Sequence, residues 1–166
     1  MGHAVLGFVL TFKLQHDASM AAIERGFTLN PNYVDWRFGW PLVVAGHSRR
    51  AIDVLEAGMR LDPFHPALAS FQVGTAHFML KEYSRALAFL RAYTSHVPQM
   101  VYGHLWLVVT YAQLGRIKEA REEIAEMLRL RPDVKVSGTI RTLIAFKNLK
   151  DEKHFFDALC KAGLPE

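Results

Sequence analysis

The sequence predicts an all-α fold in which pairs of antiparallel helices stack one after another as a solenoid. Three observations predict it. A proline recurs at nearly constant spacing, and small and large apolar residues stand at fixed distances before each proline. A short turn segment also recurs in the middle of each unit. A repeat of 20 to 50 residues is typical of stacked helical arrays, in which each unit buries its apolar face against its neighbours.

The recurring prolines end four similar segments, GFTLNP, GMRLDP, YTSHVP and MLRLRP, and the spacings between them are 32, 35 and 34 residues. A small residue lies twelve positions before each proline and a large apolar residue lies eight positions before it. Residues four apart share one face of a helix, so this pattern predicts one helix in each unit. The small residues are Ser19, Ala51, Ala86 and Ala120, and the large ones are Ile23, Leu55, Leu90 and Ile124.

Another helix is predicted upstream of this one, so that it is the first helix of each unit and the helix before the proline is the second. The position twenty-four residues before each proline holds Gly7, Gly39, Gly74 or Val108, preceded each time by an apolar residue. A small residue there lets the partner helix approach closely. The segments between the two helices, HD, AGHS, LKEY and LGR, are short and polar or contain glycine, as the turn of an antiparallel helix pair requires.

This pattern resembles the tetratricopeptide repeat (TPR), a helix-turn-helix unit of 34 residues. The resemblance covers four units, at about residues 1–31, 32–63, 67–98 and 101–132, and it implies a right-handed superhelix. Some positions depart from the family pattern. Lys81 stands where a turn glycine is common, His77 replaces a usual tyrosine, and Ser19 and Gly26 replace alanines.

The stretch WRFGWPLVVAG, residues 36–46, is expected to form the first helix of the second unit. Gly39 takes the close-packing position, and Gly46 ends the helix in the left-handed conformation. Pro41 lacks the N–H that would bond the carbonyl of Arg37, which costs about 3 kcal/mol in a helix interior. We therefore predict a kink between Arg37 and Pro41.

Residues 133–166 are expected to form a helical cap, because a repeat array needs an atypical last element over the open end of its core. Ser137 can cap a helix that runs to about Asn148. Asp151 can open a second helix, which ends at Gly163 and has Phe155 on its inward face.

A narrower resemblance rests on the terminal KAGLPE and on LNPNY, AG.S..AI and YAQLGR.KEAR within the units. These stretches are similar to the C-terminal TPR regions of bacterial adenylate/guanylate cyclase-type proteins. The resemblance implies an alternative function as the regulatory C-terminal part of a larger enzyme such as a nucleotidyl cyclase. Repeats and cap leave no room for a cyclase domain, so we expect no cyclase activity of this chain. Because the sequence begins at about the second position of the first unit, we expect a fragment of a longer protein or an array whose start is covered by something else.

Composition and motifs exclude several function classes. The chain has 166 residues, and its longest apolar runs fall well short of the roughly 18 residues that a membrane helix needs. Its net charge of +4 is dispersed, so we expect no nucleic-acid partner. No signal peptide is recognisable, and the single cysteine, Cys160, fits a reducing compartment, so cytoplasm is expected.

Catalytic and metal-binding motifs are also missing from the sequence: it contains no HExxH, CxxC, GxGxxG or GxxxxGK[ST]. His77 and His104 lie on predicted first helices and could approach one another, but we expect them to be partly buried or groove-lining polar residues. We therefore expect no enzymatic activity, no cofactor and no metal site in this chain.

The resemblance to TPR proteins implies that the first helices line a concave groove, which here would be aromatic. The groove lacks the Lys, Asn and Arg with which chaperone-binding TPR domains clamp a peptide carboxylate. We expect it to bind a hydrophobic or amphipathic protein segment, an upstream domain or a second copy as a homodimer, unless curvature buries the aromatics within the array's own core. The groove residues are Phe8, Phe12, Tyr33, Trp36, Trp40, Leu68, Phe71, Phe78, Tyr102 and Leu105.

Overall fold

The computed structural model describes residues 2–62, 64–134, 140, 144 and 146–163, and these contain helices and no β-strand. The all-α prediction is confirmed. In chain order the elements are α1 (Gly2–Phe12), α2 (His16–Leu29), the 3-10 helix η1 (Trp36–Phe38), α3 (Gly39–Val44), α4 (Ser48–Leu61), α5 (Ala67–Met79), α6 (Tyr83–His96), α7 (Val101–Gln113), α8 (Ile117–Leu130) and α10 (Leu149–Ala162).

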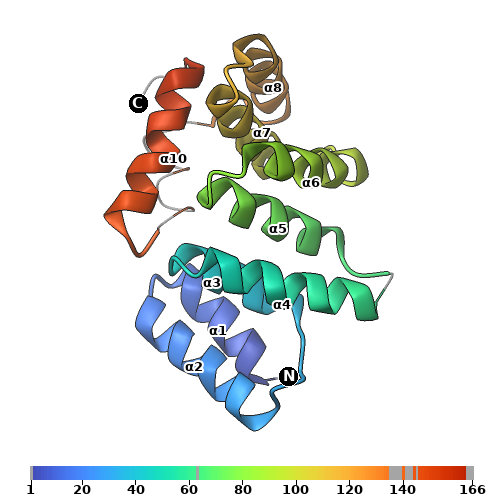
Figure 1. Cartoon of the computed structure of the whole chain (residues 1–166). Helices are drawn as coiled ribbons and strands as arrows, with labels where there is room; N and C mark the ends of the chain where they lie inside the picture. Colours follow the sequence, from blue (N-terminus) through green and yellow to red (C-terminus); the bar gives the residue numbers. More distant parts are fainter. Residues whose placement is uncertain (1, 63, 135–139, 141–143, 145, 164–166) are drawn as a thin grey trace.

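The helices pack in consecutive pairs, which stack along the molecule (Figure 1). α1 packs on α2, α3 on α4, α5 on α6 and α7 on α8. Each second helix also packs against the first helix of the next pair, so that α2 contacts α3, α4 contacts α5 and α6 contacts α7. This is the architecture of a TPR-like helical solenoid. We propose the four predicted segments as its repeat units, since each holds one pair.

The turn inside each pair has the same backbone geometry in all four pairs. The second residue after the end of the first helix adopts a positive φ. The N–H of the residue that follows it donates a hydrogen bond to the carbonyl five residues earlier, as in a Schellman motif. The positive φ angles are 60° at Leu14, 87° at Gly46, 62° at Lys81 and 76° at Gly115. The bonds run from Gln15 to Leu10, His47 to Leu42, Glu82 to His77 and Arg116 to Tyr111, at 2.8 to 3.0 Å.

The close approach of the two helices in a pair depends on the predicted glycines. A Cβ atom on Gly7 would lie 2.7 Å from Ile23 Cγ1, and one on Gly74 would lie 2.8 Å from Leu90 Cγ. In the first pair the hydroxyl of Ser19 donates a 2.7 Å bond to the carbonyl of Gly7, which explains why serine replaces alanine there. The close approach predicted at these glycines is confirmed in both pairs.

Residues 36–46 do not form one continuous α-helix. The carboxylate of Asp35 accepts a hydrogen bond from the backbone N–H of Arg37 and opens the 3-10 turn η1, and α3 begins only at Gly39. Pro41 thus lies in the first turn of α3, where a missing N–H costs little because first-turn N–H groups have no partner within the helix. At the place of the predicted kink, between Arg37 and Pro41, the structure changes from a 3-10 helix to an α-helix.

α10 lies along the first helices of the solenoid (Figure 1, red). It packs chiefly against α7, and its His154 ring lies 4.9 Å from the ring of Phe78 on α5. The buried Phe155 contacts Trp106 at 4.8 Å, and Gly163 ends the helix at a φ of 89°, as predicted. The first helix predicted for the cap, which starts at Ser137, lies largely outside the described residues.

Candidate functional site

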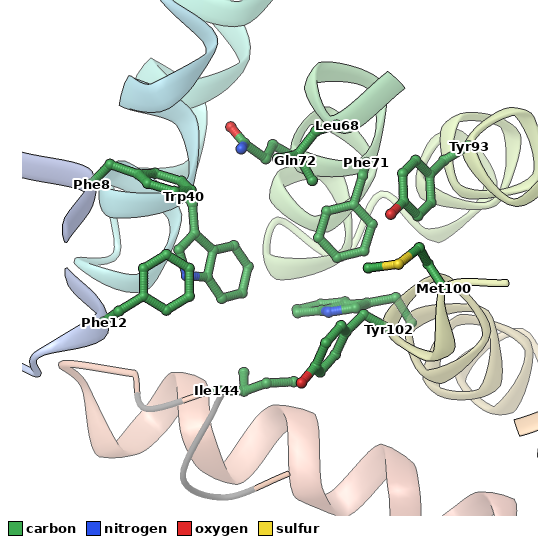
Figure 2. A pocket seen from close by; sticks show the side chains of 11 residues that line it. Phe8, Phe12, Trp40, Leu68, Phe71, Gln72, Tyr93, Met100, Tyr102 and Ile144 are labelled. Atoms are coloured by element: carbon green, nitrogen blue, oxygen red, sulfur yellow. The ribbon is translucent and has the colours of Figure 1, made fainter. Parts of the chain in front are cut away.

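The candidate site is an apolar pocket of about 190 Å³ on the side of the solenoid formed by its first helices. Figure 2 shows its side chains converging from several helices on a common space. None of the eleven described residues that line it carries a formal charge. They are Phe8, Phe12, Trp40, Leu68, Phe71, Gln72, Tyr93, Met100, Tyr102, Trp106 and Ile144, and we call them the apolar pocket.

Aromatic rings from three successive first helices form the wall of the apolar pocket. The indole of Trp40 on α3 and that of Trp106 on α7 meet nearly at right angles, with centroids 6.3 Å apart. Phe71 on α5 lies 6.4 Å from each of them. Edge-to-face contacts of this kind stabilise a ring arrangement beyond the area that it buries. The wall is therefore held in place by the packing of the array itself.

The rim of the apolar pocket is accessible, whereas its wall is buried. Trp40, Phe71 and Trp106 are all buried. Phe12 at the end of α1 is 54% exposed, and Met100 just before α7 is 41% exposed. Exposed large apolar side chains beside a preformed apolar pocket are the arrangement that small ligands and partner side chains use in proteins.

Six of the ten predicted groove residues line the apolar pocket, namely Phe8, Phe12, Trp40, Leu68, Phe71 and Tyr102. They come from α1, α3, α5 and α7, so the register of the repeat places equivalent side chains together. The assignment of a binding role to them stays a prediction, because packing alone shows no ligand.

The other four predicted residues lie elsewhere. Tyr33 precedes η1 and donates a 2.6 Å hydrogen bond to Asp35, so it does not continue a helical stripe with Trp36 and Trp40. Trp36 contacts Phe8 at 5.5 Å but lines a separate, more polar pocket beside α4. Phe78 and Leu105 are completely or almost completely buried. These two residues therefore belong to the core of the array itself, which was the alternative to a groove position.

Sequence reasoning missed five lining residues: Gln72, Tyr93, Met100, Trp106 and Ile144. Gln72 and Trp106 occupy equivalent positions 34 residues apart, so the repeat register could have indicated that both face the same side of the array. Tyr93 belongs to a second helix and touches the ring of Phe71 at 4.9 Å. Met100 and Ile144 come from segments between helices, and the periodicity of a repeat says nothing about such residues.

Gln72 brings a polar group into this apolar lining. The side chain is buried, and its Oε1 has no hydrogen-bond partner among the described residues. A Cβ atom on Gly39 would lie only 2.1 Å from that oxygen, so the amide fills the space that the glycine leaves open. The role of Gln72 in the present packing is therefore to fill the contact between α3 and α5.

His77 on α5 and His104 on α7 each lie within hydrogen-bond distance of a glutamate, and neither lines the apolar pocket. His104 Nδ1 lies 2.6 Å from Glu123 Oε2, and its Nε2 lies 2.9 Å from the carbonyl of Pro98. The hydrogen bond with Glu123 raises the pKa of His104. His77 Nδ1 lies 2.6 Å from Glu82. Both therefore tie their helix to a neighbouring segment of the fold.

Other kinds of site find no support in the part of the chain that the structure describes. There, no group of three His, Cys, Asp or Glu residues is placed to hold a metal ion. None of the described helices is both long enough and apolar enough to cross a membrane.

Comparison with known proteins bears on the fold alone. No family model matches the sequence, and no curated protein matches it. Among solved structures, a MamA protein is 24% identical over 98% of this chain and 94% of its own, with a TM-score of 0.62. A second MamA structure is 22% identical over 95% and 92%, with a TM-score of 0.63.

A third similar structure is MamA from Desulfovibrio magneticus RS-1, residues 41 to the end. It is 18% identical over 96% of this chain and 92% of that one, with a TM-score of 0.63. These likenesses do not support the resemblance to the C-terminal regions of cyclases. They extend over nearly the whole chain, and together with the paired helices they show a TPR-like helical-repeat fold.

Proposed function

We propose that this chain is a non-catalytic protein-interaction module that binds a hydrophobic or amphipathic segment of a partner protein in the apolar pocket. The observation that carries the proposal is the pocket itself: about 190 Å³ of space, walled by buried aromatic rings and open at Phe12 and Met100. An engineered apolar cavity of about 150 Å³ is known to accept benzene, so this space suits one large apolar side chain.

The chemistry of the lining favours an apolar anchor over a charged one. A peptide carboxylate would need Lys or Arg side chains, and the described lining residues include neither. Tryptophan and tyrosine are enriched among the residues that contribute most to protein interfaces, and the apolar pocket contains two of each, Trp40, Trp106, Tyr93 and Tyr102. Binding would therefore be driven by burial of apolar surface.

The test is a selection from a displayed library of random peptides, carried out in parallel on the wild-type protein and on Phe12→Glu. Phe12 is half exposed at the rim, so glutamate there should leave the fold intact while it places a charge beside the apolar pocket. We expect the wild type to enrich peptides with large apolar residues. These peptides should bind Phe12→Glu at least about tenfold more weakly.

The matched control is Phe64→Glu, which introduces the same charge at a phenylalanine that is 93% exposed and does not line the apolar pocket. Peptides selected on the wild type should bind this control unchanged. Peptides that lose affinity equally for both variants, or a selection that enriches no apolar motif, would contradict the proposal.

A further inference from the structure

The outward face of α1 is apolar and exposed. Val5 is 42% exposed, Leu6 is 49% exposed and Val9 is 45% exposed, and we call these three residues the α1 outer face. No charged Asp, Glu, Lys or Arg interrupts the helix, whose sequence is GHAVLGFVLTF. The terminal units of repeat proteins usually present polar residues on such a face, because nothing packs there.

Two of these three positions, those of Leu6 and Val9, are buried in all three later units. In the repeat register, Leu6 corresponds to Phe38, Val73 and Leu107, and Val9 corresponds to Pro41, Ala76 and Thr110. All six counterparts are buried in the structure. The α1 outer face therefore carries the residue type of an internal packing surface at a place where the described chain supplies no cover.

The structure also shows what covers these positions in the interior of the array. The ring of Phe38 packs against Phe27 of the preceding second helix, α2, with centroids 4.6 Å apart. Val73 belongs to one apolar cluster with Leu55 of the preceding second helix, α4. In both places the cover is a large apolar side chain of an amphipathic second helix, Phe27 of α2 or Leu55 of α4.

We propose that the α1 outer face is a docking site for an amphipathic helix of a partner protein, which packs on it as α2 packs on α3 and α4 packs on α5. The partner helix carries a large apolar residue on its packing face, as α2 does at Phe27 and α4 does at Leu55. It extends the solenoid by one helix. This surface is separate from the wall of the apolar pocket, so the two sites can be tested independently.

The probe is a synthetic peptide of residues 48–61, the sequence of α4, which covers the counterpart of Leu6 within this chain. An isolated helix of this length is marginal in water, so the peptide is cross-linked between positions 49 and 53, which are both exposed in α4. Fluorescence anisotropy of the labelled peptide measures its binding to the full chain. A peptide with Leu55→Glu is the matched control.

We expect the α4 peptide to bind the wild type and the Leu55→Glu peptide to bind on the order of tenfold or more weakly. Leu6→Glu in the protein should weaken binding by a similar factor, and Val9→Lys provides a second variant at an equally exposed position. Phe64→Glu should bind as the wild type does. Circular dichroism and thermal unfolding establish that each variant is folded.

Three outcomes would overturn the proposal. The first is a folded, monomeric wild type that does not bind the α4 peptide. The second is a dimer in light scattering that Leu6→Glu dissociates, since a second copy would then cover this face. The third is flotation of the protein with phosphatidylcholine vesicles that Leu6→Glu abolishes, since lipid would then be the occupant.

Discussion

Replacement of Gly74 by alanine tests the close packing on which the repeat depends. A Cβ atom at this position would lie 2.8 Å from Leu90 Cγ, 3.0 Å from Leu90 Cδ2 and 3.3 Å from the carbonyl oxygen of Ala86. Ordinary carbon contacts lie at about 3.5–4.0 Å, so α5 and α6 would have to separate by roughly 0.5–1 Å. Leu90 is fully buried, so its side chain is enclosed by the core that a new methyl group would crowd.

The magnitude follows from two opposing effects. Alanine in place of glycine in a helix gains about 1 kcal/mol through intrinsic propensity. Overpacking of a filled core costs about 1–3 kcal/mol. We therefore expect Gly74→Ala to lower the free energy of unfolding by up to about 2 kcal/mol, measured by urea denaturation followed by circular dichroism.

Gly58→Ala is the matched control, because Gly58 also lies within a helix but a Cβ atom there would meet only Val34, at 3.7 Å. This variant should be as stable as the wild type or more stable by up to about 1 kcal/mol. If Gly74→Ala unfolded at the same urea concentration as Gly58→Ala, the overpacking expected between residue 74 and Leu90 would be refuted.

Three further predictions concern the turns and the histidines. Lys81→Gly should raise the free energy of unfolding by about 0.5–1 kcal/mol in urea denaturation, because lysine is strained at a φ of 62° whereas Lys81→Ala keeps the strain. The hydrogen bond with Glu123 raises the pKa of His104, so the stabilising effect of this bond is complete below about pH 6.5 and is lost as the pH rises through the raised pKa. The difference in unfolding free energy between wild type and His104→Gln should therefore shrink with rising pH. Burial lowers the pKa of His154, so the contribution of the neutral ring to stability is complete above about pH 6.5 and is lost as the pH falls toward the lowered pKa. A pH series of thermal unfolding should show that His154→Phe removes this acid sensitivity.

The sequence predicted the fold because the repeat constrains the same positions several times. The partner helix approaches Gly7 through Ile23 and Gly74 through Leu90, as the small residue predicted at that position allows. The turn at Lys81 shows that the register carries more information than any single residue. Lysine adopts there the conformation that Gly46 and Gly115 adopt in other units, because the surrounding helices impose it.

Local interactions decided what the register could not. Asp35 opens a 3-10 turn ahead of α3, which moves Pro41 into a first turn and removes Tyr33 from the helix. A single sequence gives no means to rank this side-chain cap against a continuous helix of apolar residues.

The predicted groove was divided by the segment that follows the repeats. Phe78 is buried beside His154 of α10, whereas Phe12 stays exposed at the rim of the apolar pocket. The place where α10 packs depends on contacts between residues far apart in the chain. The repeat pattern contains no information about such contacts, so Ile144 could not be predicted as a lining residue.

The most direct test of the account is calorimetry of a library-selected peptide with the wild-type protein and with Met100→Glu. Met100 is 41% exposed and lines the apolar pocket, so the added charge lies at the site with little effect on the core. We expect a negative heat-capacity change of binding, from burial of apolar surface, and an affinity at least about tenfold lower for Met100→Glu. Equal affinity for both proteins, with binding lost on substitution elsewhere, would contradict it.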